Sequence, residues 1–254
     1  AFESGTATGT LSDEDREWFI ARGPGELVDQ IRIPTLLIQG TVDTLFTPDE
    51  AITNYGVLTG NDVPVKTLWF CGGHGVCLTD EGDTDRVSEA SFAWLDRWVK
   101  GDTKVDTGPV VDVIDQTGAT WTGDTWPPKP GRPLEAAGSG TLSMVAEGGA
   151  SGITLDAGEG GILGGLVAAS TPARATNAVN VAGSAEEDVL IIGAPELTIT
   201  YKGSVEPGPQ PMRVFAQLVD DQNDVVVGNQ ITPVPVELDG AEHTVTVPLE
   251  SIIQ

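Results

Sequence analysis

Two short stretches of the chain carry side chains that could do acid–base chemistry. The stretch GTVDTLF contains Asp43, and the stretch WFCGGHGVC contains His74. Each includes or follows an apolar run that is typical of a buried strand. A histidine beside a carboxylate can accept the proton of an attacking serine and pass it to the leaving group, while the carboxylate holds the imidazole in one tautomer. The pattern therefore predicts that Asp43 and His74 are the acid and the base of a Ser–Asp–His relay.

The nucleophile of such a relay is not evident in this chain. An α/β-hydrolase carries its triad in the chain order serine, acid, histidine, with the serine on a GxSxG turn. None of the serines in the chain has one glycine two positions before it and another two positions after it. We therefore expect the serine to lie outside this chain, in a front half of the hydrolase.

Other acids and another histidine compete for these roles. Taken alone, Asp43 could be an aspartate that caps a turn, and His74 a loop histidine without a role. Asp49 and Glu50 are the alternative acids, but both stand where a helix begins and the helix dipole favours negative charge. The second histidine, His243, falls in an alternating strand, where we expect it on the exposed face. Asp43 and His74 remain the favoured pair.

The two cysteines, Cys71 and Cys77, bracket His74. They could be unpaired thiols that pack, a disulfide that stiffens the histidine loop, or two ligands of a metal that His74 would also bind. We discount the metal because no fourth ligand is evident nearby, and because a zinc-bound imidazole could not act as a general base. The sequence therefore predicts neither a metal nor a cofactor, and it leaves the choice between thiols and a disulfide open.

Parallel strands would bring the acid and the base together. Residues 35–38 (TLLI) are apolar on both faces, as in a parallel strand covered by helices, and residues 63–70 (VPVKTLWF) form the second expected buried strand. Helices are expected to begin after Ser12 and at Thr47-Pro48, and to cover residues 84–99. Since the carboxyl ends of parallel strands share one edge of the sheet, Asp43 and His74 should meet there.

The character of the sequence changes after Gly101. Short alternating segments separated by Gly and Pro then predict a β-sandwich or jelly roll. The expected strands are Val110–Ile114, Gly140–Val145, Val189–Ile192, Glu196–Tyr201, Met212–Leu218, Asp224–Val227 and His243–Pro248. The Gly-rich stretch Ala146–Gly165 lacks a phosphate-loop lysine and is expected to be surface loop. We predict two domains: residues 1–103 as the C-terminal part of an α/β-hydrolase domain, and residues 104–254 as a jelly roll that is incomplete at its C-terminus.

Composition narrows the classes of partner. The 254 residues include 38 acidic and 13 basic side chains, for a net charge of −25. Such a surface repels nucleic acid and anionic membranes, so neither is an expected partner. No apolar run approaches the ~18 residues of a membrane span. The 32 glycines and 17 prolines suit a globular protein rich in loops and strands.

Five segments, in this order, form a pattern that resembles one family. The first three are IRIPTLLIQGTVDTLFTPDEA, WFCGGHGVCL and FAWLDRWVKGD, and the last two are VVDVIDQTGATWTGDTWPP and DVLIIGAPELTIT. They resemble the end of the catalytic domain and the C-terminal jelly roll of the X-Pro dipeptidyl-peptidase and cocaine-esterase-like hydrolases, peptidase family S15. Trp121, Trp126, Pro127 and Pro128 match the Trp…Trp-Pro-Pro pattern at the entry to that jelly roll. We expect the two indole rings to pack between domains rather than to bind sugar.

The resemblance implies a serine hydrolase of acyl bonds that uses Asp43 and His74, with a small-molecule acyl ester, amide or peptide as substrate. Within the family the bond could be an ester, a β-lactam side-chain amide or an X-Pro peptide. We favour an esterase or acylase over an X-Pro dipeptidyl-peptidase, because no acidic cluster for a substrate amino terminus is visible. The alternative, from another functional class, is a non-catalytic binding protein. It would be built on a degenerate hydrolase and would bind carbohydrate or a partner. Either function is compatible with a homo-oligomer. We favour an extracellular or cell-envelope location over the cytoplasm.

Overall fold

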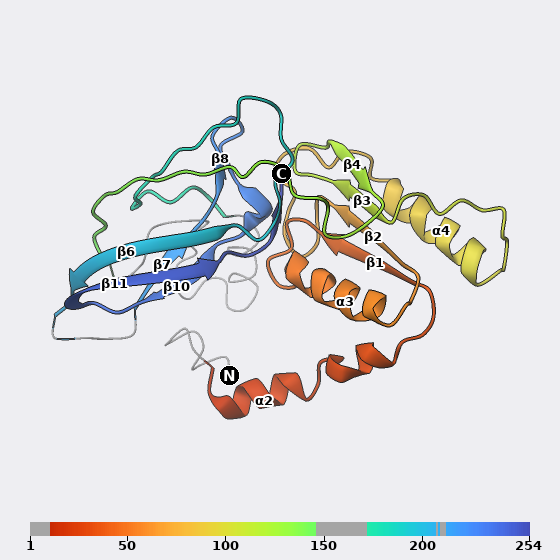
Figure 1. The fold of residues 1–254 in the computed structure, drawn as a ribbon, viewed down its shortest axis with the longest axis horizontal. Helices are drawn as coiled ribbons and strands as arrows, with labels where there is room; N and C mark the ends of the chain where they lie inside the picture. Colours follow the sequence, from red (N-terminus) through yellow and green to blue (C-terminus); the bar gives the residue numbers. More distant parts are fainter. Residues whose placement is uncertain (1–10, 146–171, 207, 209–211) are drawn as a thin grey trace, which may run out of the picture.

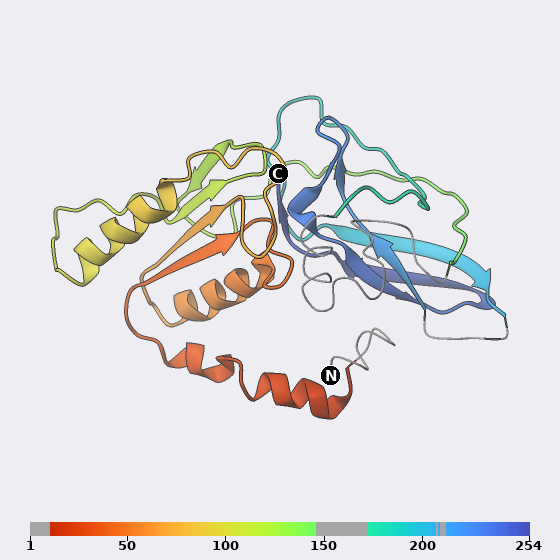
Figure 2. The ribbon, with the colours of Figure 1, turned by 180° about the vertical axis from the view of Figure 1, so that it is seen from behind.

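The computed structural model describes residues 11–145, 172–206, 208 and 212–254. In these residues the chain forms two parts that lie side by side (Figures 1 and 2). One part combines helices with a four-stranded sheet, and the other is built from antiparallel strand pairs. The stretch Ala146–Gly165, which the sequence predicts to be surface loop, lies outside the described residues.

Helices and strands alternate in the α/β part. It begins with α2 (Asp13–Ile20), whose N-cap Ser12 accepts a hydrogen bond from the backbone N–H of Asp15 at 3.1 Å, as the capping spacing predicts. The next elements are η1 (Gly25–Gln30), β1 (Thr35–Gly40), α3 (Pro48–Gly60), β2 (Val65–Phe70) and α4 (Arg86–Trp98). Pro48 stands in the first turn of α3, where its missing N–H costs no hydrogen bond. The expected helices and both strands are therefore present. The burial predicted for residues 35–38 is wrong, because β1 is the edge strand of the described sheet: residues 35–37 are only half-buried and Ile38 is 41% exposed.

Strands β1 and β2 are neighbours in a sheet of order β1-β2-β3-β4. They pair in parallel along their whole length, so both end at the same edge of the sheet. Strand β3 (Val111–Ile114) pairs in parallel with β2, and β4 (Thr120–Gly123) pairs antiparallel with β3. The sheet thus continues past residue 104, where the sequence places the start of the second domain.

The β-rich part contains the longest strand pair, β6 (Glu196–Ser204) with β11 (Asp239–Pro248). Its other strands are β5 (Ile192–Gly193), β7 (Met212–Ala216), β8 (Val219–Asp220), β9 (Val225–Val226), β10 (Thr232–Val236) and β12 (Ile252–Ile253), and the short helix η2 (Val227–Asn229) follows β9. The fold class is therefore α/β plus β, as predicted. The hydrolase sheet and the jelly roll stay predictions.

Two expected strands differ from the structure. Residues 140–145 form no strand, and the strand expected over Val189–Ile192 begins only at Ile192. An alternating pattern describes which side chains could face a core, but a strand also needs a neighbour for its backbone hydrogen bonds. In the described part of the chain, residues 140–145 have no such neighbour.

A shared core joins the two parts. Trp69 of β2 is 1% exposed and packs with Val111, Val113 and Ile253, the last of which lies almost at the C-terminus. The ring of Trp126 lies 4.8 Å from that of Trp69, and Trp121 packs against the same cluster. Trp69, in the expected buried strand, therefore lies in the core, and Trp121 and Trp126 pack against the same cluster.

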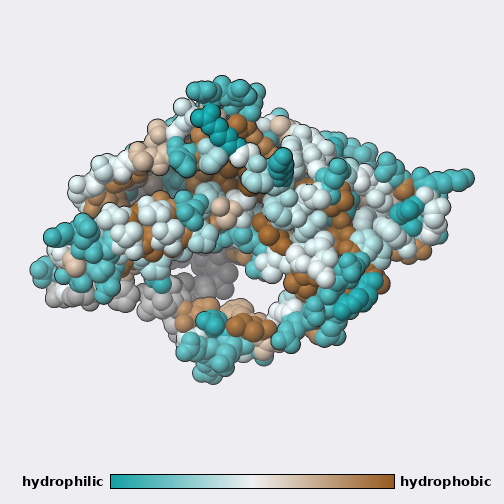
Figure 3. Space-filling view, viewed as in Figure 1, coloured by the Kyte–Doolittle hydropathy of each residue, from teal (hydrophilic) through white to brown (hydrophobic). Residues whose placement is uncertain are grey.

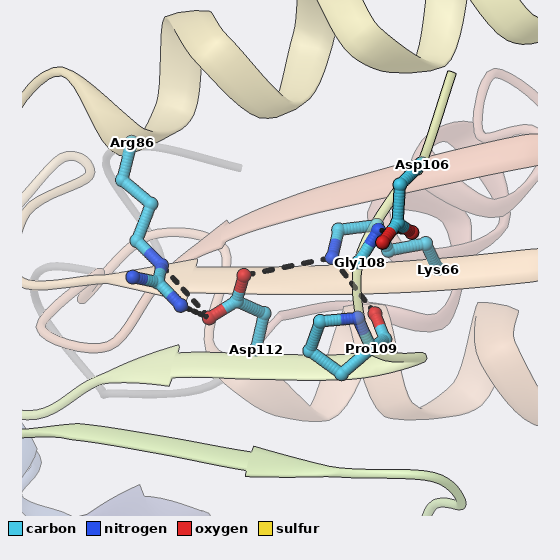
Figure 4. Close-up of polar contacts among 6 residues, drawn as sticks. All are labelled: Lys66, Arg86, Asp106, Gly108, Pro109 and Asp112. Atoms are coloured by element: carbon cyan, nitrogen blue, oxygen red, sulfur yellow. Dashed lines mark hydrogen bonds and ion pairs between the residues drawn. The ribbon is translucent and has the colours of Figure 1, made fainter. Parts of the chain in front are cut away.

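A buried ionic cluster links β2, β3 and α4 (Figure 4). The carboxylate of Asp112 accepts hydrogen bonds from Arg86 at 2.6 Å and from Lys66 at 3.5 Å, and Lys66 also donates to the carbonyl of Pro109 at 2.7 Å. Burial lowers the pKa of Lys66, and the charge of Asp112 opposes that shift. The cluster is satisfied within itself and holds the first turn of α4 to the sheet.

Apolar side chains remain exposed around the α/β part. Figure 3 shows brown, hydrophobic surface at α2, where Ile20 is 62% exposed. On α4, Phe92 is 67% and the following Val99 76% exposed. Strand β1 is an edge strand of the described sheet. No helix in the described ranges is both long and apolar enough to cross a membrane.

Candidate active site

The ends of two paired strands bring Asp43 and His74 together. Asp43 follows β1 and His74 follows β2, and these strands run in parallel side by side. The imidazole Nδ1 lies 2.9 Å from the carboxylate Oδ2. The structure thus shows the contact that the sequence predicts, and the role of the pair in catalysis stays a prediction.

The carboxylate of Asp43 is held by its own loop. Its second oxygen, Oδ1, accepts hydrogen bonds from the backbone N–H groups of Leu45 at 3.0 Å and Phe46 at 2.9 Å. The residue is only 5% exposed. Burial acts to raise the pKa of Asp43, but the hydrogen bonds from Phe46, His74 and Leu45 outweigh it and leave the pKa below its ordinary value. Asp43 is therefore an oriented anion at neutral pH.

The imidazole of His74 has one side engaged and the other accessible. Because an ionised carboxylate only accepts, the neutral ring must carry its proton on Nδ1, and Nε2 keeps a free lone pair. The side chain is 53% exposed, and the ring of Phe46 packs edge-on against it at 5.2 Å. In the described part of the chain, the hydrogen bond of the ring is the one to Asp43. Nε2 can therefore accept a proton from a group outside these residues.

Glycines allow the histidine loop to pass close to the aspartate loop. Gly73 has φ +115°, and a Cβ there would lie 2.7 Å from the side chain of Asp43. A Cβ on Gly75 would lie 1.7 Å from the carbonyl oxygen of Val42. Any larger residue at either position would separate the two loops. This approach thus requires glycine at positions 73 and 75.

A disulfide joins the two ends of the histidine loop. Cys71 and Cys77 are bonded, with their Cα atoms 5.4 Å apart. Of the three alternatives that the sequence leaves for these residues, the disulfide is the correct one. The bond encloses His74 in a short ring of chain, which limits the positions that its backbone can take. With both sulfurs bonded, neither cysteine is a thiolate ligand for a metal.

Asp49 and His243 have partners elsewhere. Both oxygens of Asp49 accept hydrogen bonds from Ser251, and Glu50 lies in the first turn of α3. His243 contacts Asp239 at 2.8 Å within β11, and this hydrogen bond raises its pKa. The structure therefore keeps Asp49 and His243 out of the Asp43–His74 contact.

Two residues that the sequence does not single out also contact the site. Gln230 donates from Nε2 to the backbone carbonyl of Asp43 at 2.8 Å, and Asn229 donates from Nδ2 to the carbonyl of Val76 at 3.0 Å. They are separated from these partners by 187 and 153 positions. No local pattern in the sequence identifies contacts of such range.

Comparison with known proteins adds no assignment. No protein-family model matches the chain, and neither the curated proteins nor the solved structures contain a match. Any function must therefore be argued from the geometry of the site.

Proposed function

We propose that this chain supplies the acid and the base of a serine hydrolase that cleaves acyl ester or amide bonds, of the esterase or acylase type. One observation carries the proposal: His74 Nδ1 lies 2.9 Å from the buried carboxylate of Asp43, at the shared edge of two parallel strands, and the ring is half exposed. Active sites of α/β sheets gather at this edge. The resemblance to family S15 and its jelly roll adds to the same proposal.

The geometry suits proton transfer to and from a serine. A serine Oγ attacks the acyl carbonyl while His74 Nε2 accepts its proton, and the imidazolium then protonates the leaving alcohol or amine. In the second half of the reaction, Nε2 accepts a proton from the water that hydrolyses the acyl-enzyme, and the serine recovers its own. The anion of Asp43 stabilises the imidazolium in both halves and holds Nδ1–H in place.

The serine is proposed to come from outside this chain. Several described serine hydroxyls are already bonded elsewhere: those of Ser88 and Ser91 to carbonyls in and before α4, and that of Ser251 to Asp49. The outer edge of β1 has no partner strand in the described sheet. A strand added there would extend the sheet and could carry a serine at the same edge as Asp43 and His74.

Labelling with a fluorophosphonate, which reacts with activated serines, tests the proposal. The 254-residue chain alone should not be labelled, whereas a longer protein that also carries the serine should be labelled and should hydrolyse acyl esters. In that longer protein, Asp43→Asn should lower turnover by about 10⁴-fold while the fold is retained. Asp49→Asn is the matched control and should leave turnover within a few-fold.

Two outcomes would contradict the proposal. Stoichiometric labelling of the 254-residue chain would place the nucleophile within residues 1–254. Unchanged turnover in Asp43→Asn would remove Asp43 from the relay. A longer protein that neither reacts nor hydrolyses, yet binds carbohydrate or another protein, would favour the non-catalytic alternative.

A further inference from the structure

We infer that Asn229 and Gln230, two consecutive residues of the β-rich part, are positioning residues that hold the loops of Asp43 and His74 together. The inference rests on the proposed function, because it assigns these residues to the relay proposed above. It concerns the geometry of the Asp43–His74 pair, which can be measured without any turnover.

Gln230 holds the backbone of the acid. It is 7% exposed, and its amide donates to the carbonyl oxygen of Asp43 at 2.8 Å. The carboxylate of Asp43 is oriented by Leu45 and Phe46, which belong to the same loop and move with it. Gln230 instead belongs to a distant segment, so its bond sets where the whole loop lies.

Asn229 holds the loop of the base. It is 2% exposed, and its amide donates to the carbonyl oxygen of Val76, two residues after His74. A Cβ on Gly75 would lie 3.2 Å from the same amide nitrogen, so the side chain lies directly against this loop. Asn229 has φ 56°, a conformation that asparagine tolerates better than most residues.

The turn that presents both amides is itself anchored. Gly228 has φ 67°, and its N–H donates to the side chain of Gln116 at 2.6 Å. Gln116 is fully buried just after β3, in the sheet that also contains β1 and β2. The two amides therefore extend from a turn that is attached to the same sheet as the two loops.

Adjacent residues on one anchored turn thus bond to each of the two loops. The contact between Nδ1 and Oδ2 tolerates displacements of only about 0.5 Å before its geometry degrades. The strands β1 and β2 fix where the loops begin, but not how far they extend beyond the sheet. Loss of either amide should let one loop move relative to the other and weaken the Nδ1–H donation to Asp43.

The tautomer of His74 tests the inference. With only two histidines in the chain, a His243→Gln variant assigns both rings in long-range ¹H–¹⁵N spectra, which report the nitrogen that carries the proton. At alkaline pH, where the rings are neutral, the wild-type chain should show His74 protonated on Nδ1. Gln230→Met, similar in volume but without a donor, should lower the Nδ1–H to Nε2–H ratio by on the order of fivefold, the effect of one ordinary hydrogen bond.

Asn229→Gly should lower the ratio by a similar factor. Glycine accepts the left-handed φ, so this variant deletes the amide without backbone strain. The matched control is Ser251→Ala, which removes another hydrogen bond between the two parts, the one from Ser251 Oγ to Asp49 at 2.6 Å. The control should leave the tautomer ratio of His74 unchanged.

A wild-type ratio in folded Gln230→Met and Asn229→Gly would overturn the inference. An equal change in Ser251→Ala would also overturn it, because the effect would then come from general loosening of the interface. If Gln230→Met does not fold, Asn229→Gly decides the question alone. A failed labelling experiment on the longer protein would leave these spectra unchanged, so failure of the proposed function and failure of the positioning role are distinguished.

Discussion

At the scale of single residues, the site depends on an aspartate that stays charged although it is almost fully buried. Asp43 receives hydrogen bonds from two backbone N–H groups and from the imidazole, which favour the anion over the neutral acid. The result is an acceptor that fixes one proton of His74 on Nδ1. The other ring nitrogen, Nε2, therefore keeps a free lone pair that can accept a proton.

The lowered pKa of Asp43 predicts how stability depends on pH. Its folded pKa lies below the ordinary value of 3.8, so its hydrogen bonds contribute stability that is fully present above about pH 4 and is lost as the pH falls through the folded pKa. The variant Asp43→Asn does not titrate and lacks this contribution. The difference in unfolding free energy between wild type and variant should shrink as the pH falls below about 4.

Urea unfolding at several pH values measures this difference. A difference that does not shrink between about pH 4 and pH 2 would show that the hydrogen bonds do not favour the anion in solution.

At the scale of elements, the buried cluster of Lys66, Arg86 and Asp112 fastens α4 to the sheet (Figure 4). Asp112→Asn would leave Lys66 buried with its charge uncompensated, because Lys66 is only 3% exposed. Breaking a buried pair in this way costs about 3–5 kcal/mol of unfolding free energy. The control Asp96→Asn removes an exposed pair with Lys100 and should cost about 0.5 kcal/mol or less. Equal losses in the two variants would contradict a buried ionic role.

The disulfide acts on the element that carries the base. Closing a loop as short as the one between Cys71 and Cys77 stabilises the chain by about 2–3 kcal/mol in the loop-entropy account. Reduction should therefore lower the unfolding free energy by about this amount and speed amide hydrogen exchange in residues 72–76. The denatured, unreduced protein should show no titratable thiol. Two free thiols in that assay would rule the bond out in solution.

At the scale of the whole molecule, exposed apolar surface on α2 and α4 accompanies an edge of β1 that has no partner strand among the described residues. Isolated proteins rarely leave such surface uncovered. The 254-residue chain should therefore self-associate as its concentration rises, measured by sedimentation velocity. Replacing Phe92 and Val99, two of its most exposed apolar side chains, with glutamate should reduce association. A chain that is monomeric at every concentration would show that this surface is not adhesive.

Local features of the fold could be predicted from the sequence because short-range forces decide them. The cap at Ser12, the proline that opens α3, and the apolar runs that become β1 and β2 each depend on neighbours within a few positions. Parallel pairing of those two runs was enough to place Asp43 beside His74.

The remaining features were decided only by tertiary structure. The sequence could not choose between free thiols and a disulfide at Cys71, and it did not predict that β3 joins the first sheet or that Gln230 holds the acid. It also could not show that Asp49 bonds to Ser251. Each of these contacts depends on which distant segments pack against one another. Hydrophobic burial over the whole chain determines that packing. No periodicity or spacing within one segment records which far segment it will contact.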